Sequence, residues 1–192
     1  KMNKITLFSS PFDETAVDLL ESLETPAYKV ASFELVDLPL IKYIAKRKKP
    51  ILFSTGMANL DEINEAIKVA KMSGCDQLGI FHCISSYPAP ISSANLSAIK
   101  VLQKEFNVQV GLSDHTIGTT AGIVATSLGA SIIEKHFTLS RDEGGVDSSF
   151  SLEPEEMKVF VDKIRTAHSS LGDGHAIRSP AEKENLVFRR SL

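Results

Sequence analysis

Short runs of apolar residues alternate along the chain with longer segments in which apolar residues recur at helical spacing. The short runs predict six β-strands, at residues 5–8, 27–31, 50–53, 77–83, 108–112 and 131–135. The longer segments predict six α-helices, at residues 13–23, 39–46, 60–73, 93–106, 119–128 and 154–171. Strands that alternate with helices predict an α/β fold with parallel pairing and helical crossovers. A doubly wound open sheet and a (β/α)8 barrel both satisfy this order.

Several helix boundaries are marked by residues with known capping roles. Asn59 stands before the third predicted helix with Glu62 three residues later, a pattern that predicts a capping box. Gly74 and Gly129 stand just after predicted helices, where a left-handed residue ends the helix. The basic run 46–49 also follows a predicted helix, so we interpret it as a helix end, where cations are favourable.

The composition is typical of a soluble protein with one sizeable core. The 192 residues carry a formal net charge of -3, with 43% hydrophobic and 23% charged residues. Acidic and basic residues are mixed, which gives no reason to expect nucleic-acid binding. No apolar run approaches the ~20 residues that span a bilayer, and we expect no membrane association. Two cysteines form no disulfide framework, which favours a cytoplasmic location.

Polar side chains gather at the ends of the first three predicted strands, where α/β proteins bind ligands. Ser10 follows the first strand. Lys29 lies within the apolar second strand, where its ammonium group needs an anion such as a phosphate or carboxylate. The alternative is that its aliphatic side chain extends along the strand so that the ammonium group reaches solvent. Ser32 and Glu34 follow Lys29 directly. Ser54 opens the sequence STGM after the third strand, where a glycine lets backbone amides approach an anion.

Histidines occur at the ends of the last three predicted strands. His82 ends the fourth strand and His115 follows the fifth. Two imidazoles from neighbouring strand ends can share one divalent cation, although a lone strand histidine is more often a hydrogen-bonded core residue. Asp114 is placed to orient an imidazole from behind. The weaker candidates for lining the same pocket are Ser10, Asp114, His136 and Asp147.

These segments together resemble the sialic acid synthase family, whose members condense phosphoenolpyruvate with amino sugars to make nonulosonic acids. The resemblance rests on residues 10–13 (SPFD), 28–34 (YKVASFE), 54–57 (STGM), 82–88 (HCISSYP), 111–116 (GLSDHT) and 134–138 (EKHFT), which occur in the family's order. Phe33 and the segment 144–154 look most like the pseudaminic acid branch, since an apolar side chain beside the sugar suits a deoxy sugar with a methyl group. The N-acetylneuraminate and legionaminate branches are the alternatives.

The family resemblance implies a (β/α)8 barrel followed by a small antifreeze-protein-like domain. The six predicted strands match the third to the eighth of that barrel, which predicts a partial TIM barrel over residues 1–171 and a linker over residues 172–192. Two further strands before Lys1, with a family glutamate and a phosphate-binding lysine, and a C-terminal domain after Leu192 are expected in a longer homodimeric parent. Six strands cannot close an eight-stranded barrel, so exposed edges are expected.

The resemblance also implies a chemistry. A divalent metal, with Mn²⁺ expected and Mg²⁺ or Co²⁺ as alternatives, polarises the sugar aldehyde, and the enol carbon of phosphoenolpyruvate attacks it. Water then adds at the carbon that bears phosphate, and phosphate leaves with C–O cleavage. The expected catalytic residues are Glu34, His82 and His115, of which the two histidines hold the metal. The expected ligands of phosphoenolpyruvate are Lys29, Ser32, Ser54, Ser86 and Tyr87.

Two other functions are compatible with the same residues. An aldolase would use Lys29 as a Schiff base with a carbonyl substrate. A non-catalytic remnant is the second alternative, because a chain that lacks two barrel strands is expected to be inactive alone. For the synthase, the expected partners are small molecules, phosphoenolpyruvate and an amino sugar.

Overall fold

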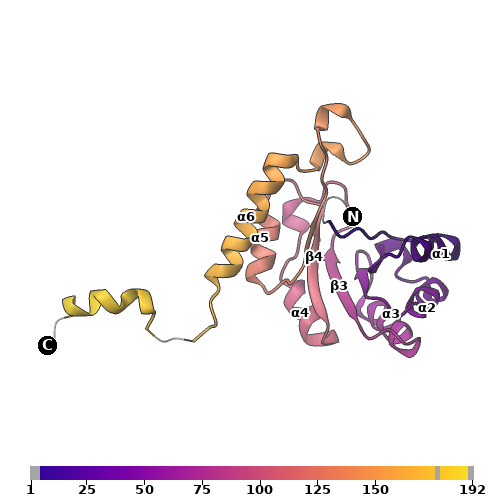
Figure 1. Cartoon of the computed structure of the whole chain (residues 1–192), viewed down its shortest axis with the longest axis horizontal. Helices are drawn as coiled ribbons and strands as arrows, with labels where there is room; N and C mark the ends of the chain where they lie inside the picture. Colours follow the sequence, from indigo (N-terminus) through magenta and orange to yellow (C-terminus); the bar gives the residue numbers. More distant parts are fainter. Residues whose placement is uncertain (1–4, 176–177, 190–192) are drawn as a thin grey trace.

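The computed structural model describes residues 5–175 and 178–189. Its centre is a sheet of five parallel strands in the order β1-β2-β3-β4-β5, so each strand pairs with its neighbour in sequence (Figure 1). The strands are β1 (Tyr28–Val30), β2 (Ile51–Ser54), β3 (Leu78–Cys83), β4 (Gln109–Asp114) and β5 (Ile133–Lys135). The predicted parallel α/β pattern is confirmed, and the chain forms part of a barrel.

One ion pair shows how strongly the sheet curls. Lys29 on β1 and Glu134 on β5 lie on the two outermost strands, yet Lys29 Nζ is 2.7 Å from Glu134 Oε1. In a flat sheet these strands would lie about 19 Å apart, four spacings of ~4.8 Å, which two side chains cannot bridge so closely. The pair therefore crosses the hollow of a half-barrel, and both side chains point to its concave face.

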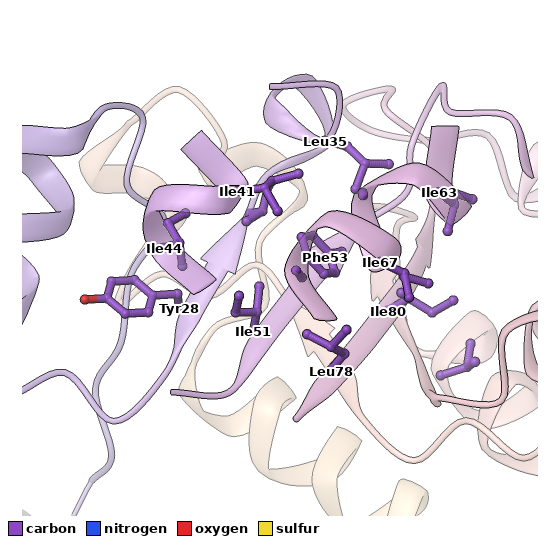
Figure 2. Close-up of a cluster of buried hydrophobic side chains, with 14 of the residues drawn as sticks. Tyr28, Leu35, Ile41, Ile44, Ile51, Phe53, Ile63, Ile67, Leu78 and Ile80 are labelled. Carbon is purple, nitrogen blue, oxygen red and sulfur yellow. The ribbon is translucent and has the colours of Figure 1, made fainter. Parts of the chain in front are cut away.

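Helices follow the strands and pack on the convex face of the sheet. They are α1 (Glu14–Ser22), α2 (Leu38–Ala45), α3 (Leu60–Met72), α4 (Ala98–Phe106), α5 (Thr120–Ser127) and α6 (Pro154–Ser170). The core lies between the two layers: Tyr28, Ile51, Phe53 and Ile80 from the strands meet Ile41, Ile44, Ile63 and Ile67 from the helices (Figure 2). Burial of these side chains stabilises the half-barrel by roughly 1.5–3 kcal/mol each.

The predicted helix ends are confirmed where capping residues marked them. The Asn59 side chain accepts from the Glu62 amide at 3.0 Å, and the Glu62 carboxylate accepts from the Asn59 amide at 2.8 Å. Gly74 and Gly129 have φ of +97° and +95°, as the left-handed ends of α3 and α5 require. The basic run 46–49 follows the last residue of α2, as expected from its charge.

Two predicted elements differ from the structure. Residues 5–8 form no strand, because only Ser9 pairs with β1, through an isolated bridge to Tyr28, and Ile5 and Leu7 are 77% and 82% exposed. In the described part of the chain, no strand lies on the outer side of this segment to cover its apolar side chains. The helix predicted over residues 93–106 begins only at Ala98, because a short 3-10 turn, η2 (Ile91–Ser93), precedes it.

The C-terminal part of the chain leaves the half-barrel after α6. A 3-10 helix, η5 (Pro180–Phe188), lies apart from the sheet, in yellow in Figure 1. Its residues have no buried side chain. Among the described residues, no helix combines the length and apolar character that crossing a membrane requires.

Candidate active site

The concave face carries a chain of polar contacts between the last two strands and the first. Glu134 Oε1 accepts from Lys29 Nζ at 2.7 Å and from Ser113 Oγ at 2.7 Å. Lys29 was expected to face an anion, and Glu134 is an anion supplied by the chain itself. The ammonium group has three donors, so this pairing still leaves Lys29 with hydrogen-bonding capacity toward a ligand.

Two imidazoles and two aromatic rings meet beside this chain of contacts. The ring centroids of His115 and His136 are 5.3 Å apart, and the Tyr87 ring lies 4.4 Å from His115 and 6.1 Å from His136. The Phe150 ring packs against His136, and their ring centroids are 5.0 Å apart. Burial raises the pKa of the Tyr87 hydroxyl above its usual range, so it stays protonated as a donor. The cluster brings together three predicted site residues, Tyr87, His115 and His136.

The ring nitrogens of the two imidazoles have different partners. His115 Nδ1 lies 2.8 Å from the Ile84 carbonyl oxygen, an acceptor, so Nδ1 carries the hydrogen. The other nitrogen, Nε2, lies 3.2 Å from Ser113 Oγ, whose single hydrogen goes to Glu134. Burial, and then the neighbouring His115, lower the pKa of His136. The Nδ1 atom of His136 lies 3.6 Å from Oδ2 of Asp147, another of the weaker pocket candidates.

His82 points to the opposite face of the sheet. Its Nε2 lies 2.8 Å from the carbonyl oxygen of Ala94, on the helix side, and the ring lines an outer groove between α3 and α4. In β3, Phe81 and Cys83 face the hollow, because Lys29 Nζ lies 5.7 Å from the Phe81 ring centroid and Cys83 Sγ lies 3.3 Å from Ser32 Oγ. His82 and His115 therefore lie on opposite faces of the sheet and cannot share one metal ion, contrary to the expectation from sequence. The imidazole that lies beside His115 is that of His136.

A second polar pocket lies at the ends of β1, β2 and β3. The Gly56 amide donates to Ser32 Oγ at 3.2 Å, and a methyl group at Gly56 would lie 2.1 Å from Ser85 Oγ. Among the described residues, Ser54 Oγ and one oxygen of Glu34 are buried without a hydrogen-bond partner, and the nearest side-chain partner of the buried Ser85 Oγ is the Tyr87 hydroxyl. Unsatisfied buried polar atoms are costly in a native protein, so they mark a place where a polar ligand fits. Gly56, Ser32 and Ser85 lie together, and Ser54 ends the neighbouring strand β2; we call this group of four residues the serine pocket.

Three further predictions about single residues need correction or remain open. Ser86 donates to the Pro88 carbonyl at 3.2 Å and closes a local turn, whereas Ser85 faces the serine pocket. Asp114 contacts no imidazole in the described structure, because its oxygens accept from Lys135 and Thr116. Ser10 is half-buried next to Ser9, the residue that pairs with β1, and no contact ties it to the site.

Sequence reasoning missed three residues of the site: Ser85, Ser113 and Glu134. The alternation of side chains along a strand could have found two of them. Ser85 is two residues beyond Cys83, and Ser113 is two residues before His115, so each shares a face with a residue already considered. Glu134 is two residues before His136 and so shares its face, but the partner of Glu134, Lys29, lies 105 residues away in sequence.

A clasp of arginine and glutamate holds the loop that carries Asp147. Arg141 donates from Nη1 to Glu156 Oε2 at 2.5 Å and from Nη2 to Oε1 at 3.0 Å, and Nη1 also donates to the Ser151 carbonyl at 3.0 Å. The loop between β5 and α6 is thereby tied to the first turn of α6. Because the pair is partly exposed, it adds little stability but fixes the loop.

This clasp predicts a pH dependence. Hydrogen bonds from Arg141 lower the pKa of Glu156 from 4.5 to about 2. Since the folded pKa lies below the ordinary one, the stabilisation is complete above pH 4.5 and is lost as the pH falls toward 2. We expect Arg141→Ala to return the Glu156 titration toward 4.5, measured by NMR of the side-chain carboxyl. An unchanged Glu156 pKa in the variant would contradict the clasp.

The serine pocket gives a second prediction. Gly56→Ala places a methyl group against Ser85 Oγ, Ser32 Oγ and Cys83 Sγ, at 2.1, 2.8 and 3.1 Å before any shift. The hydroxyls must move, so we expect the affinity for phosphoenolpyruvate to fall about tenfold, a change of ~1.4 kcal/mol. Isothermal titration calorimetry measures this change.

The control for this prediction is Met57→Ala. The Met57 side chain is 65% exposed and lines the outer groove rather than the serine pocket. Equal losses of affinity in the two variants would contradict the assignment of Gly56 to an anion pocket.

A metal ion is compatible with the imidazole cluster only if other ligands complete its shell. Among the described residues, no group of three His, Cys, Asp or Glu side chains gathers in a way that could hold a metal. His115 and His136 supply two neutral nitrogen donors, and water or substrate oxygens would supply the rest. Open positions of this kind are typical of catalytic metal sites.

Comparison with known proteins places this geometry in context. The sequence pattern of the NeuB family matches residues 1–176. The chain is 43% identical over 195 residues to N,N'-diacetyllegionaminic acid synthase of Campylobacter jejuni, covering 100% of this chain and 58% of that protein. It is equally 43% identical, over 188 residues, to pseudaminic acid synthase of the same species, covering 98% and 55%. The chain thus spans about half the length of the curated relatives it matches.

A solved structure shows the same fold. The chain superimposes on N-acetylneuraminic acid synthetase of Leptospira borgpetersenii, in complex with citrate, with a TM-score of 0.92 and 32% identity. The match covers all of this chain and 67% of that one. The resemblance noted from the strand-end segments is confirmed by these comparisons.

Proposed function

Because the chain belongs to the NeuB family, we propose that it serves in the condensation of phosphoenolpyruvate with an amino-sugar aldehyde to a nonulosonic acid. The carbon–carbon bond forms between the enol carbon of phosphoenolpyruvate and the aldehyde carbon, and the aldehyde oxygen takes a proton. Water adds to the carbon that carries phosphate, whose C–O bond then breaks. The products are a 2-keto-3-deoxy sugar acid and inorganic phosphate.

One observation carries this proposal. The concave face joins a cationic lysine, a pocket of serine hydroxyls and a pair of imidazoles, which together match an anionic phosphate ester and an aldehyde. Lys29 and the serine pocket are assigned to the charged groups of phosphoenolpyruvate, because ammonium, hydroxyl and backbone amide groups are the donors that phosphate accepts from. Tyr87, whose ring lies 4.4 Å from that of His115, is assigned to the same anion as a hydroxyl donor.

The imidazole pair is assigned to the aldehyde. We propose that His115 and His136 hold a divalent metal, with Mn²⁺ as the first choice and Mg²⁺ or Co²⁺ as alternatives, and that the metal supplies Lewis-acid polarisation of the carbonyl. The chain's own groups orient the ring nitrogens: Ile84 accepts from His115, and Asp147 lies beside His136. Glu34, with one buried unpartnered oxygen, is assigned to a sugar hydroxyl or to proton transfer.

The sugar assignment rests on Phe33 at the rim. Phe33 lies in η1 (Ser32–Glu34), between Ser32 and Glu34, and is 65% exposed. An exposed apolar ring beside the sugar favours a substrate with a methyl group, so we propose the pseudaminic branch. The equal identity to the legionaminic and pseudaminic synthases leaves N-acetylneuraminate and legionaminate synthesis as alternatives to test with each hexose.

A Schiff-base aldolase is disfavoured by the position of Lys29. The Lys29 Nζ atom is held by Glu134 at 2.7 Å, whereas a Schiff-base lysine needs a nitrogen that is free to attack the substrate carbonyl. Borohydride treatment with a carbonyl substrate separates the two mechanisms. We expect no covalent adduct on Lys29, and a trapped adduct would replace condensation with aldol chemistry.

Condensation itself is tested by phosphate release. The chain is assayed with phosphoenolpyruvate, Mn²⁺ and each amino sugar, both alone and mixed with the N-terminal segment of a curated relative. We expect sugar-dependent phosphate release when the segment is present. Binding of phosphoenolpyruvate without turnover in both assays would favour the remnant reading instead.

A further inference from the structure

A buried ion pair lies directly behind the two imidazoles. Lys135 Nζ lies 2.9 Å from Asp114 Oδ2, and the two side chains are 2% and 0% exposed. Asp114 precedes His115 and Lys135 precedes His136, and the two are aligned partners in the pairing of β4 with β5. Their side chains leave the sheet on the face opposite to Ser113 and Glu134, which bond across the hollow.

The same two side chains also fix the turn that carries His115. Asp114 Oδ1 accepts from the Thr116 amide at 2.9 Å and from the Thr116 hydroxyl at 2.7 Å, and Lys135 Nζ donates to the Thr116 carbonyl oxygen. Residues on both sides of His115 are therefore bound to one ammonium group. On the other strand that ammonium belongs to the residue next to His136.

Besides this ion pair, the end of β5 is held by the Ser113–Glu134 hydrogen bond and by the Leu152 amide, which donates to the His136 carbonyl oxygen at 2.9 Å. The strand has three residues, pairs only with β4, and forms an edge of the described sheet. A buried ion pair is no better for stability than two well-packed apolar side chains, since desolvation offsets the attraction. Such a pair does impose one alignment, because a shift of β5 by one residue would leave both charges buried and unpaired.

We infer that Asp114 and Lys135 are positioning residues, which lock β4 and β5 in the register that brings His115 and His136 to one metal ion. This inference rests on the proposed function, because it assumes that the imidazole pair binds metal. The pair touches neither ring and acts through the backbone of the residues that carry them. Removing one partner should therefore weaken metal binding even in a protein that remains folded.

The test measures Mn²⁺ affinity of the purified chain by electron paramagnetic resonance of the free ion. We expect Lys135→Met and Asp114→Asn each to weaken Mn²⁺ binding about 10- to 100-fold, as loss of groups that orient metal ligands does. Lys135→Arg, which keeps the charge, should restore most of the affinity. The control Ile44→Ala removes a fully buried side chain of α2, lowers the melting temperature and should leave Mn²⁺ affinity unchanged.

Two results would overturn the inference: unchanged affinity in folded Lys135→Met and Asp114→Asn, or an equal loss in Ile44→Ala. If a single variant fails to fold, the double variant Asp114→Asn with Lys135→Met removes both charges and is judged by the same affinity criterion. The variant His115→Ala separates a failure of the proposed metal site from a failure of the positioning role. Unchanged Mn²⁺ affinity in His115→Ala refutes the proposed metal pair, whereas loss there with full affinity in the Lys135 variants refutes only the positioning role.

Discussion

His115→Ala and His136→Ala are each expected to lower the affinity for Mn²⁺ at least about 100-fold, a larger loss than removal of groups that only orient the ligands. The two rings are 5.3 Å apart, and each can supply one nitrogen ligand. A site with two protein ligands that loses one keeps a single imidazole, which binds metal weakly in competition with water. Turnover that depends on metal should fall in parallel.

His82→Ala is the matched control for these variants. His82 is also buried at a strand end, but its ring bonds to the Ala94 carbonyl on the helix side. Its removal is expected to lower stability by about 1–3 kcal/mol, through a lost hydrogen bond and an unsatisfied carbonyl, and to leave Mn²⁺ affinity in place. A metal site that disappears in His82→Ala but survives in His136→Ala would reverse the assignment.

Lys29→Met is expected to weaken phosphoenolpyruvate binding roughly 100-fold while leaving amino-sugar binding nearly unchanged. Hydrogen bonds to charged groups contribute about 1.5–3 kcal/mol, equivalent to roughly 10- to 150-fold in affinity. The substitution also leaves Glu134 without its cation, and the carboxylate then repels the anionic ligand. Both effects act on phosphoenolpyruvate and neither acts on a neutral sugar, so competition binding with each substrate separates them.

The control for Lys29→Met is Lys49→Met. Lys49 also forms an ion pair, with Glu21 at 2.8 Å, but on the outer surface beside α1. Its loss should leave the affinity for phosphoenolpyruvate unchanged. If Lys29→Met weakened the binding of the sugar and of phosphoenolpyruvate equally, the lysine would be a structural brace across the half-barrel rather than a ligand.

Local patterns were sufficient to predict the elements of the half-barrel. Helix ends depend on residues that are close in sequence, such as Asn59 and Glu62 in the capping box and the glycines that end α3 and α5. A short stretch of sequence is therefore enough to predict them. Residues 5–8 show the limit of this reasoning. Their apolar run predicts a strand, but a strand also needs neighbours, and these residues pair only through the Ser9 bridge.

The sequence identified most residues of the candidate site, but it did not predict how their side chains are arranged. His82 and His115 occupy similar places in their strands, and only the face of each side chain separates them. His82 is within β3 and alternates with the inward Cys83, whereas His115 lies beyond β4 in a turn fixed by Thr116. Alternation continued beyond β3 explains why Ser85, two residues after the inward Cys83, faces the serine pocket and Ser86 does not. The contact between Lys29 and Glu134 depends on the curl of the whole sheet, which no local pattern records.

Anomalous X-ray diffraction from crystals of the protein soaked in Mn²⁺ tests the central claim most directly. The account predicts one strong manganese peak on the concave face, within coordination distance of His115 Nε2 and of the His136 ring. A peak bound to His82 in the groove between α3 and α4, or a fully loaded site that excludes His136, would contradict it.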